Sequence, residues 1–142
     1  MKHHGQSGAT TVEFALVLIL FLMFMLAIVD FGRMLYTWNA ATEATRAGAR
    51  YAVVCDATSN QDAVLARMQA LMPQIADIGV EWTPAGCTTA NCVGVTVTIE
   101  NLDFNWISPI LGASGIDVPM PPFSTFLTRE VMRMDPASEA IC

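Results

Sequence analysis

The stretch that decides the fold is GQSGATTVEFALVLILFLMFMLAIVDFG, which runs from Gly5 to Gly32. Within it, Phe14–Val29 is a run of sixteen residues with no charge, proline or glycine. Glu13 lies directly before this run, inside what reads as one continuous apolar helix. A carboxylate at the mouth of a membrane-length segment is costly unless another group compensates its charge. The sequence therefore raises two questions, the purpose of Glu13 and the purpose of the small, polar leader before it.

The apolar run has three interpretations: a cleaved secretory signal, a core helix and a membrane anchor. Its sixteen residues span roughly 24 Å, and residues 9–12 extend it to the length of a ~30 Å hydrocarbon core if Glu13 is tolerated. A secretory signal needs a small-residue cleavage site after the run, whereas VDFGRMLY follows here. A core helix would have a polar stripe, and FALVLILFLMFMLAIV has none. The pattern favours a transmembrane helix over residues 9–30.

The orientation of this helix does not follow from its flanking charges. Lys2 precedes the segment, while Arg33, Arg46 and Arg50 follow it, so a count of positive residues does not decide the orientation. All four cysteines and ten of the thirteen acidic residues lie within residues 55–142. This distribution favours a cytoplasmic N-terminus and an extracytoplasmic domain over residues 31–142.

The helical pattern continues beyond the apolar run without a proline, through DFGRMLYTWNAATEATRAGARYAVVC. A helix from about Ala9 to Val54 would have roughly 46 residues and a length of ~70 Å. Residues spaced by three and four predict one packed face: Phe31, Leu35, Trp38, Ala41, Ala44, Gly48, Tyr51 and Ala52. A row of small residues, Ala40, Ala44, Gly48 and Ala52, would let another element approach the backbone closely. Packing within the chain is favoured over packing between subunits.

Composition excludes several classes of function. The chain has 142 residues, a mean hydropathy of +0.46 and a net charge of −6, with no basic stripe, which argues against nucleic-acid binding. Both histidines, His3 and His4, lie in the leader, so any later site lacks the commonest general base and metal ligand. We therefore expect no catalytic residues, no metal and no cofactor.

The four cysteines, Cys55, Cys87, Cys92 and Cys142, all follow the apolar run. An even number suits disulfides in an oxidising compartment, and three pairings are possible. We favour Cys87–Cys92 across a turn and Cys55–Cys142 at the end of the first helix, over free thiols in a cytosolic protein. The spacing of Cys87 and Cys92 fits neither a zinc pair nor a thiol oxidoreductase.

The remaining chain predicts a small α+β domain. SNQDAVLARMQALMPQIADIG (59–79) predicts a second helix capped by Ser59 and Asp62 and kinked or shortened by Pro73. Strands are expected at 80–83, at VGVTVTIE (93–100) with alternating burial from Val93 onward, and at 124–134. Residues 101–123 predict a long loop, with WISPIL as a short helical turn. We expect a pilin-like α+β fold with a long N-terminal helix, a second helix and a small antiparallel sheet.

GATTVEFALVL and IVDFGRMLYTWNAATEATRAGARYAV together resemble the TadE-like pilus assembly proteins, minor pilins or pseudopilins of the tight-adherence (Flp, type IVc) system. The resemblance is dense over residues 8–53 and looser at VTVTIE and REVMRM. It implies a cleavable leader over residues 1–8, cut by a prepilin peptidase between Gly8 and Ala9. A cut after Gly5 would leave Glu13 eighth instead of fifth, so Gly8 is preferred.

The resemblance also implies how such a protein works. Glu13, with the adjoining Phe14, would serve assembly by neutralising the N-terminal amine of a neighbouring subunit in the helix bundle, because two opposite charges become tolerable as a pair. The implied location is the bacterial inner membrane, in a single pass. The implied partners are the membrane, the major Flp pilin, a sibling pseudopilin, the peptidase and the inner-membrane assembly platform, in a system of adhesion and secretion type. The family leaves open whether such proteins enter the fibre or stay in the membrane.

Two rival hypotheses remain. The first is an uncleaved, membrane-anchored periplasmic domain that binds a partner or acts as a scaffold through residues 101–123. The second is a membrane-tethered thiol redox enzyme that uses Cys87 and Cys92. An intact Met1 in the mature protein would favour the first, and reactive thiols under native conditions would favour the second.

Overall fold

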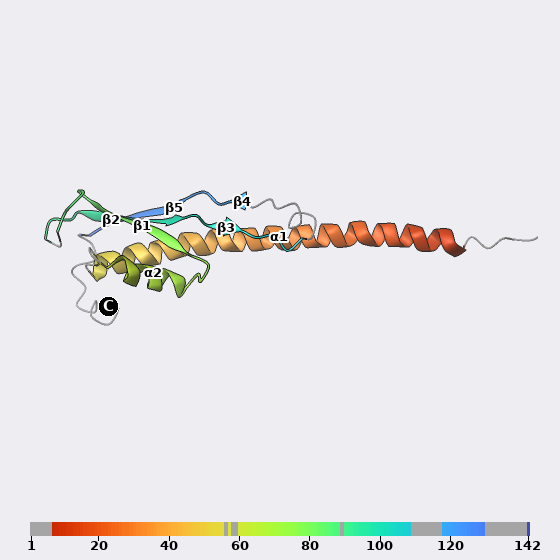
Figure 1. Cartoon of the computed structure of the whole chain (residues 1–142), viewed down its shortest axis with the longest axis horizontal. Helices are drawn as coiled ribbons and strands as arrows, with labels where there is room; N and C mark the ends of the chain where they lie inside the picture. Colours follow the sequence, from red (N-terminus) through yellow and green to blue (C-terminus); the bar gives the residue numbers. More distant parts are fainter. Residues whose placement is uncertain (1–6, 56, 58–59, 89, 109–117, 130–141) are drawn as a thin grey trace, which may run out of the picture. The chain divides into compact units, whose positions relative to one another are not determined.

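The computed structural model describes residues 7–55, 57, 60–88, 90–108, 118–129 and 142. Over these residues the chain forms a long helix, a short helix and two small antiparallel sheets (Figure 1). The elements are α1 (Ser7–Val54), α2 (Gln61–Gln69), β1 (Asp77–Thr83), β2 (Gly94–Glu100), β3 (Asp103–Phe104), β4 (Val118–Pro119) and β5 (Phe123–Thr128). The predicted α+β fold, with its long apolar N-terminal helix, is confirmed.

The chain divides into two compact units. The first consists of Met1–Leu35 and Asn105–Asp117, and the second of Tyr36–Phe104 and Val118–Cys142. Helix α1 contributes its first part to one unit and its last part to the other.

In the second unit, α1 is buried on a face of small residues. Ala41, Ala44, Ala49 and Ala52 are fully buried, and Gly48 is buried as well. The packed face predicted from the sequence is therefore buried only from Ala41 onward, whereas its first members, Phe31, Leu35 and Trp38, are 60%, 48% and 42% exposed. Small side chains allow neighbouring elements to reach the helix backbone, and this close approach is what buries them.

The main sheet has the strand order β1-β2-β5, and both pairings are antiparallel. Val95, Val97 and Ile99 of β2 are buried, as the alternating pattern predicts. Val93 lies just before the strand and is 52% exposed, so that end of the predicted alternation is wrong. The strand expected at 80–83 begins earlier, at Asp77, and the one expected from Ser124 begins at Phe123 and is described as far as Thr128.

The inner face of the sheet packs on the second part of α1. The hydroxyls of Thr45 and Thr125 lie 2.9 Å apart in a hydrogen bond between α1 and β5. The rings of Trp38 and Phe123 meet edge to face, with their centroids 4.9 Å apart. Figure 1 shows the three strands running along this part of α1. These contacts fix which face of the sheet is buried.

Helix α2 is shorter than predicted. Its N-cap is Asn60, whose side-chain oxygen accepts a hydrogen bond from the Ala63 amide at 3.2 Å, while Ser59 lies outside the described residues. The capping box on Ser59 is therefore wrong, because Asn60 caps the helix equally well one residue later. The helix ends at Gln69, four residues before Pro73, which has no amide hydrogen to continue the hydrogen-bond ladder. Ile78, predicted on this helix, is a buried residue of β1.

The segment predicted as a loop over residues 101–123 contains regular structure. Its strands β3 and β4 pair through Asp103 with Pro119 and Phe104 with Val118, and the Met120 amide donates to the Leu102 carbonyl at 3.0 Å. The prediction of one long loop over residues 101–123 is therefore wrong, because this short ladder pairs backbone groups within it. Residues 106–108 of WISPIL form no helix, and the rest of that motif lies outside the described residues.

Both favoured disulfides are formed. Cys55 pairs with Cys142, with Cα atoms 5.5 Å apart, and Cys87 pairs with Cys92, with Cα atoms 5.1 Å apart. Cys55 directly follows α1, so the first bond ties the end of the chain to the end of the long helix. The second closes the turn between β1 and β2.

Candidate functional site

The predicted processing and assembly residues all lie on the first turns of α1. Gly8 is the second residue of the helix, and a side chain placed there would meet no other atom within 4 Å. Ala9 is exposed beside it, and residues 1–6 of the leader lie outside the described residues. Within the described chain, nothing covers the peptide bond between Gly8 and Ala9.

Glu13 is exposed on α1, surrounded by apolar side chains of the same helix. Within the described part of the chain it makes no hydrogen bond or ion pair. The adjoining Phe14 is 67% exposed. Both predicted assembly residues are therefore exposed, and no described residue compensates the charge of Glu13.

The first part of α1 carries an uncovered apolar surface. From Val12 to Val29 its large apolar side chains are 40–67% exposed, apart from Leu26, which is half-buried. Among the described residues, α1 is the one helix long and apolar enough to cross a membrane, and none of its most apolar window is buried. A core helix of a soluble protein would have this surface covered, whereas the described chain leaves it exposed.

The apolar surface ends at a buried carboxylate. Asp30 of α1 is fully buried, and its two oxygens accept backbone hydrogen bonds from Ile107 at 3.0 Å and Ser108 at 2.9 Å. A carboxylate that accepts two amide hydrogens is a strong, charge-assisted contact. It holds residues 107–108 against the helix just where the uncharged run stops.

Arg33 completes this contact one turn further along α1. Its guanidinium lies 3.3 Å from the Asp30 carboxylate and donates to the Asn105 carbonyl, also at 3.3 Å. Asp30 and Arg33 were not among the site residues predicted from the sequence. The signal was present, because an acid directly after an apolar run and three residues before an arginine needs a local partner.

The row of small residues on α1 packs within the chain. A Cβ atom on Gly48 would lie 2.5 Å from Met68 Sδ and 2.7 Å from Met68 Cγ, so the side chain of α2 occupies the space that glycine leaves. Ala44 and Ala52 are fully buried, while Ala40 at the start of the row is half-buried. This row is therefore an intramolecular packing surface in the second unit.

Over the residues described, no group of three or more His, Cys, Asp or Glu side chains is placed to hold a metal ion. The four cysteines are all in disulfides. The groups that stand out chemically are therefore the exposed Glu13, the Asp30 contact and the apolar surface between them.

Residues 8–50 match the model of the TadE-like protein family, which confirms the resemblance seen in the motifs. The match covers the apolar run, Glu13, Asp30 and most of the small-residue row. No curated protein and no solved structure matches the chain.

Proposed function

From this TadE-like match, we propose that the protein is a membrane-anchored minor pilin or pseudopilin that takes part in assembling a Tad/Flp pilus. The observation that carries the proposal is the exposed Glu13 on an uncovered, membrane-length apolar helix. A surface of this kind favours lipid or the apolar helices of other subunits. The function is assembly through helix contacts, without catalysis.

Processing supplies the partner for Glu13. A prepilin peptidase cuts after Gly8, and the new amine of Ala9 pairs with Glu13 of a neighbouring subunit. Each charge alone is costly in a low-dielectric helix bundle, and the pair reduces that cost and sets the axial register. The exposure of Gly8, Ala9 and Glu13 supports this scheme, because none of them is covered by the described part of the chain.

The proposed topology is a single pass through the inner membrane, with the N-terminus in the cytoplasm and the second unit in the periplasm. Two disulfides support an oxidising location for the second unit. The Asp30 contact would then lie at the outer boundary of the membrane, where its backbone hydrogen bonds satisfy the carboxylate. The partners are the peptidase, the assembly platform and other pilin subunits.

Mass spectrometry of the purified full chain tests the processing step. The expected mass is that of a chain beginning at Ala9, and Gly8→Ala is expected to leave the leader attached. An intact leader in the wild-type chain, made together with the peptidase, would contradict the proposal and favour an uncleaved anchored domain.

Glu13→Gln tests the assembly step. The variant removes the charge and keeps the shape, so membrane insertion should be unchanged or improved while the assembled subunit falls by at least about tenfold. Membrane fractionation and pilus yield measure the two effects. Glu13→Asp is the matched control and should retain part of the assembly. Normal piliation with Glu13→Gln would rule out the pairing.

A further inference from the structure

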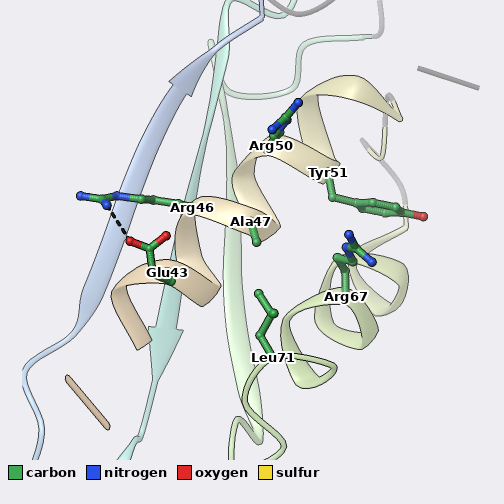
Figure 2. Close-up of a pocket in the computed structure, with 7 residues that line it drawn as sticks. All are labelled: Glu43, Arg46, Ala47, Arg50, Tyr51, Arg67 and Leu71. Atoms are coloured by element: carbon green, nitrogen blue, oxygen red, sulfur yellow. Dashed lines mark hydrogen bonds and ion pairs between the residues drawn. The ribbon is translucent and has the colours of Figure 1, made fainter. Parts of the chain in front are cut away.

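An open cavity of about 510 Å³ lies between α1 and α2 in the second unit. Figure 2 shows its lining residues: five lie on α1, Arg67 lies on α2, and Leu71 lies just after α2. Glu43 lies beside Arg46 at one side. The lining consists of Glu43, Arg46, Ala47, Arg50, Tyr51, Arg67 and Leu71. We call it the arginine cavity.

The arginine cavity concentrates positive charge in an acidic protein. It holds three of the seven basic side chains of a chain whose net charge is −6. Its one carboxylate, Glu43, pairs with Arg46 at 2.9 Å, as the dashed line in Figure 2 marks. Arg50 and Arg67 form no ion pair with any described residue. Two guanidinium groups are therefore available to bind carboxylates, with Ala47 and Leu71 as apolar lining.

The complementary surface lies on the outward face of the three-stranded sheet. Asp77 and Glu81 alternate on this face of β1, and Glu100 of β2 lies directly opposite Asp77. All three carboxylates are exposed, and β1, β2 and β5 contain no Lys or Arg. Like charges directly opposite each other destabilise a sheet, a cost that an external cation would remove. We call these three residues the acidic face.

The acidic face also has an apolar neighbour. Thr96 of β2 pairs with Glu81 of β1 on one side and with Phe126 of β5 on the other, so these three residues form one cross-strand row. The Phe126 side chain is 52% exposed. Its ring covers Gly94, where a Cβ atom would lie 2.6 Å from the Phe126 Cζ. An exposed aromatic ring held beside carboxylates matches a cavity that combines arginines with apolar lining.

The two surfaces lie on different layers of the second unit. The inner face of the sheet is buried on α1 through Thr45 and Thr125, so the acidic face points away from the helices that form the arginine cavity. When two different, complementary patches of one chain bind each other, the contact between copies is heterologous. Such contacts build an open stack of subunits unless the rotation from one subunit to the next closes a ring.

We propose that the arginine cavity of one copy binds the acidic face of a second copy, and that the contact repeats from subunit to subunit. The proposal rests on the assembly function above and adds an electrostatic interface outside the membrane to the Glu13 pair inside it. Arg50 and Arg67 bind the carboxylates of Glu81 and Glu100, and Phe126 packs toward the apolar lining.

Photo-crosslinking of the full chain in lipid vesicles tests this contact. A benzoylphenylalanine replaces Leu71, which lines the cavity and is 56% exposed, and ¹⁴N and ¹⁵N copies are mixed. The expected product joins the benzoylphenylalanine of one isotopic copy to a β1 or β2 peptide of the other. Crosslinks to lipid alone, or to other parts of a second copy, would overturn the proposal.

Charge reversal sharpens the test. Arg50→Glu with Arg67→Glu should lower the crosslink yield roughly tenfold, and so should Glu81→Arg with Glu100→Arg, because attraction becomes repulsion at the interface. All four changes in one chain should restore the yield. Asp62→Arg is the matched control, since it reverses an exposed carboxylate of α2 outside the acidic face and should leave the yield unchanged. Reversals without effect would overturn the proposal.

The outcomes separate this contact from the proposed function. If Glu13→Gln abolishes piliation while the reversals do not alter the crosslink, the charge contact is wrong and the pilin function stands. If the crosslink forms and responds to reversal, while the wild-type chain made together with the peptidase keeps its leader, the contact stands and the processed pilin is wrong.

Discussion

The two parts of α1 differ in side-chain size and in burial, although they belong to one continuous helix. From Val12 to Val29 the side chains are large and apolar, and most are 40–67% exposed. From Ala41 to Val53 the inward side chains are small and are buried to 0–1%. Hydrophobicity alone does not decide burial here, because the more apolar part is the uncovered one. Side-chain size decides which part other elements of the chain can approach closely.

The boundary between the two parts carries the polar contacts. Asp30 holds the backbone of residues 107–108, and Arg33 holds Asn105. Beyond them, Trp38 meets Phe123 and the packing of the second unit begins. Substitutions should therefore destabilise the protein in the packed part of α1, have little effect in the uncovered part and act locally at the boundary.

The largest effect is expected from the bond that ties the packed part to the C-terminus. Cys55→Ser with Cys142→Ser opens a loop with a sequence separation of 87 residues and should lower the free energy of unfolding by about 4 kcal/mol. Denaturant unfolding of the full chain in detergent, followed by tryptophan fluorescence, measures it. Cys87→Ser with Cys92→Ser, which opens a separation of 5, should cost only about 2 kcal/mol. Equal losses would contradict the loop-entropy explanation.

A matched pair of glycines tests the comparison directly. Gly48→Leu forces Met68, which is fully buried, out of its place and should cost about 3 kcal/mol. Gly32→Leu places the same side chain where no atom lies within 4 Å, and should change stability by less than about 0.5 kcal/mol. Both are measured by the same unfolding experiment. A similar loss in the free energy of unfolding at both positions would contradict the difference in packing between the two parts of α1.

The smallest effect is expected at the boundary. Asp30→Asn keeps one acceptor oxygen and loses the charge, so the amides of Ile107 and Ser108 should exchange with solvent roughly tenfold faster. Hydrogen-exchange mass spectrometry of the full chain measures the change. The amide of Val93, which donates to the Thr83 carbonyl in the second unit, is the internal control and should be unaffected. Unchanged exchange at Ile107 and Ser108 would mean that Asp30 does not hold this segment.

Local rules predicted much of this protein. The absence of proline through Val54 predicted the long helix, alternation predicted β2, and Pro73 predicted the shortening of α2. They missed the N-cap at Asn60, because Ser59 and Asn60 are both good caps and only the register of the helix selects between them. They also missed β3 and β4, because a two-residue ladder has no periodicity to detect.

Some features of the candidate site could likewise be predicted from the sequence, and others could not. The position of Glu13 and the apolar run could be predicted from the order of residues alone, because a stretch of large apolar residues without a polar stripe has no distinct inward face. The partners of Asp30 were not readable, because Ile107 and Ser108 lie 77 and 78 residues away and donate backbone groups, which every residue has. The acidic face likewise needed the register of β1 and β2 to bring Asp77 opposite Glu100.

The sequence by itself determined that one helix would be long, apolar at its start and lined with small residues further on. Only the tertiary structure decided that Met68 fills the space above Gly48 and that the backbone at 107–108 satisfies Asp30. The physical reason is that helix length and exposure follow from local side-chain chemistry. A packing partner or a backbone donor is specified only by where the folded chain returns.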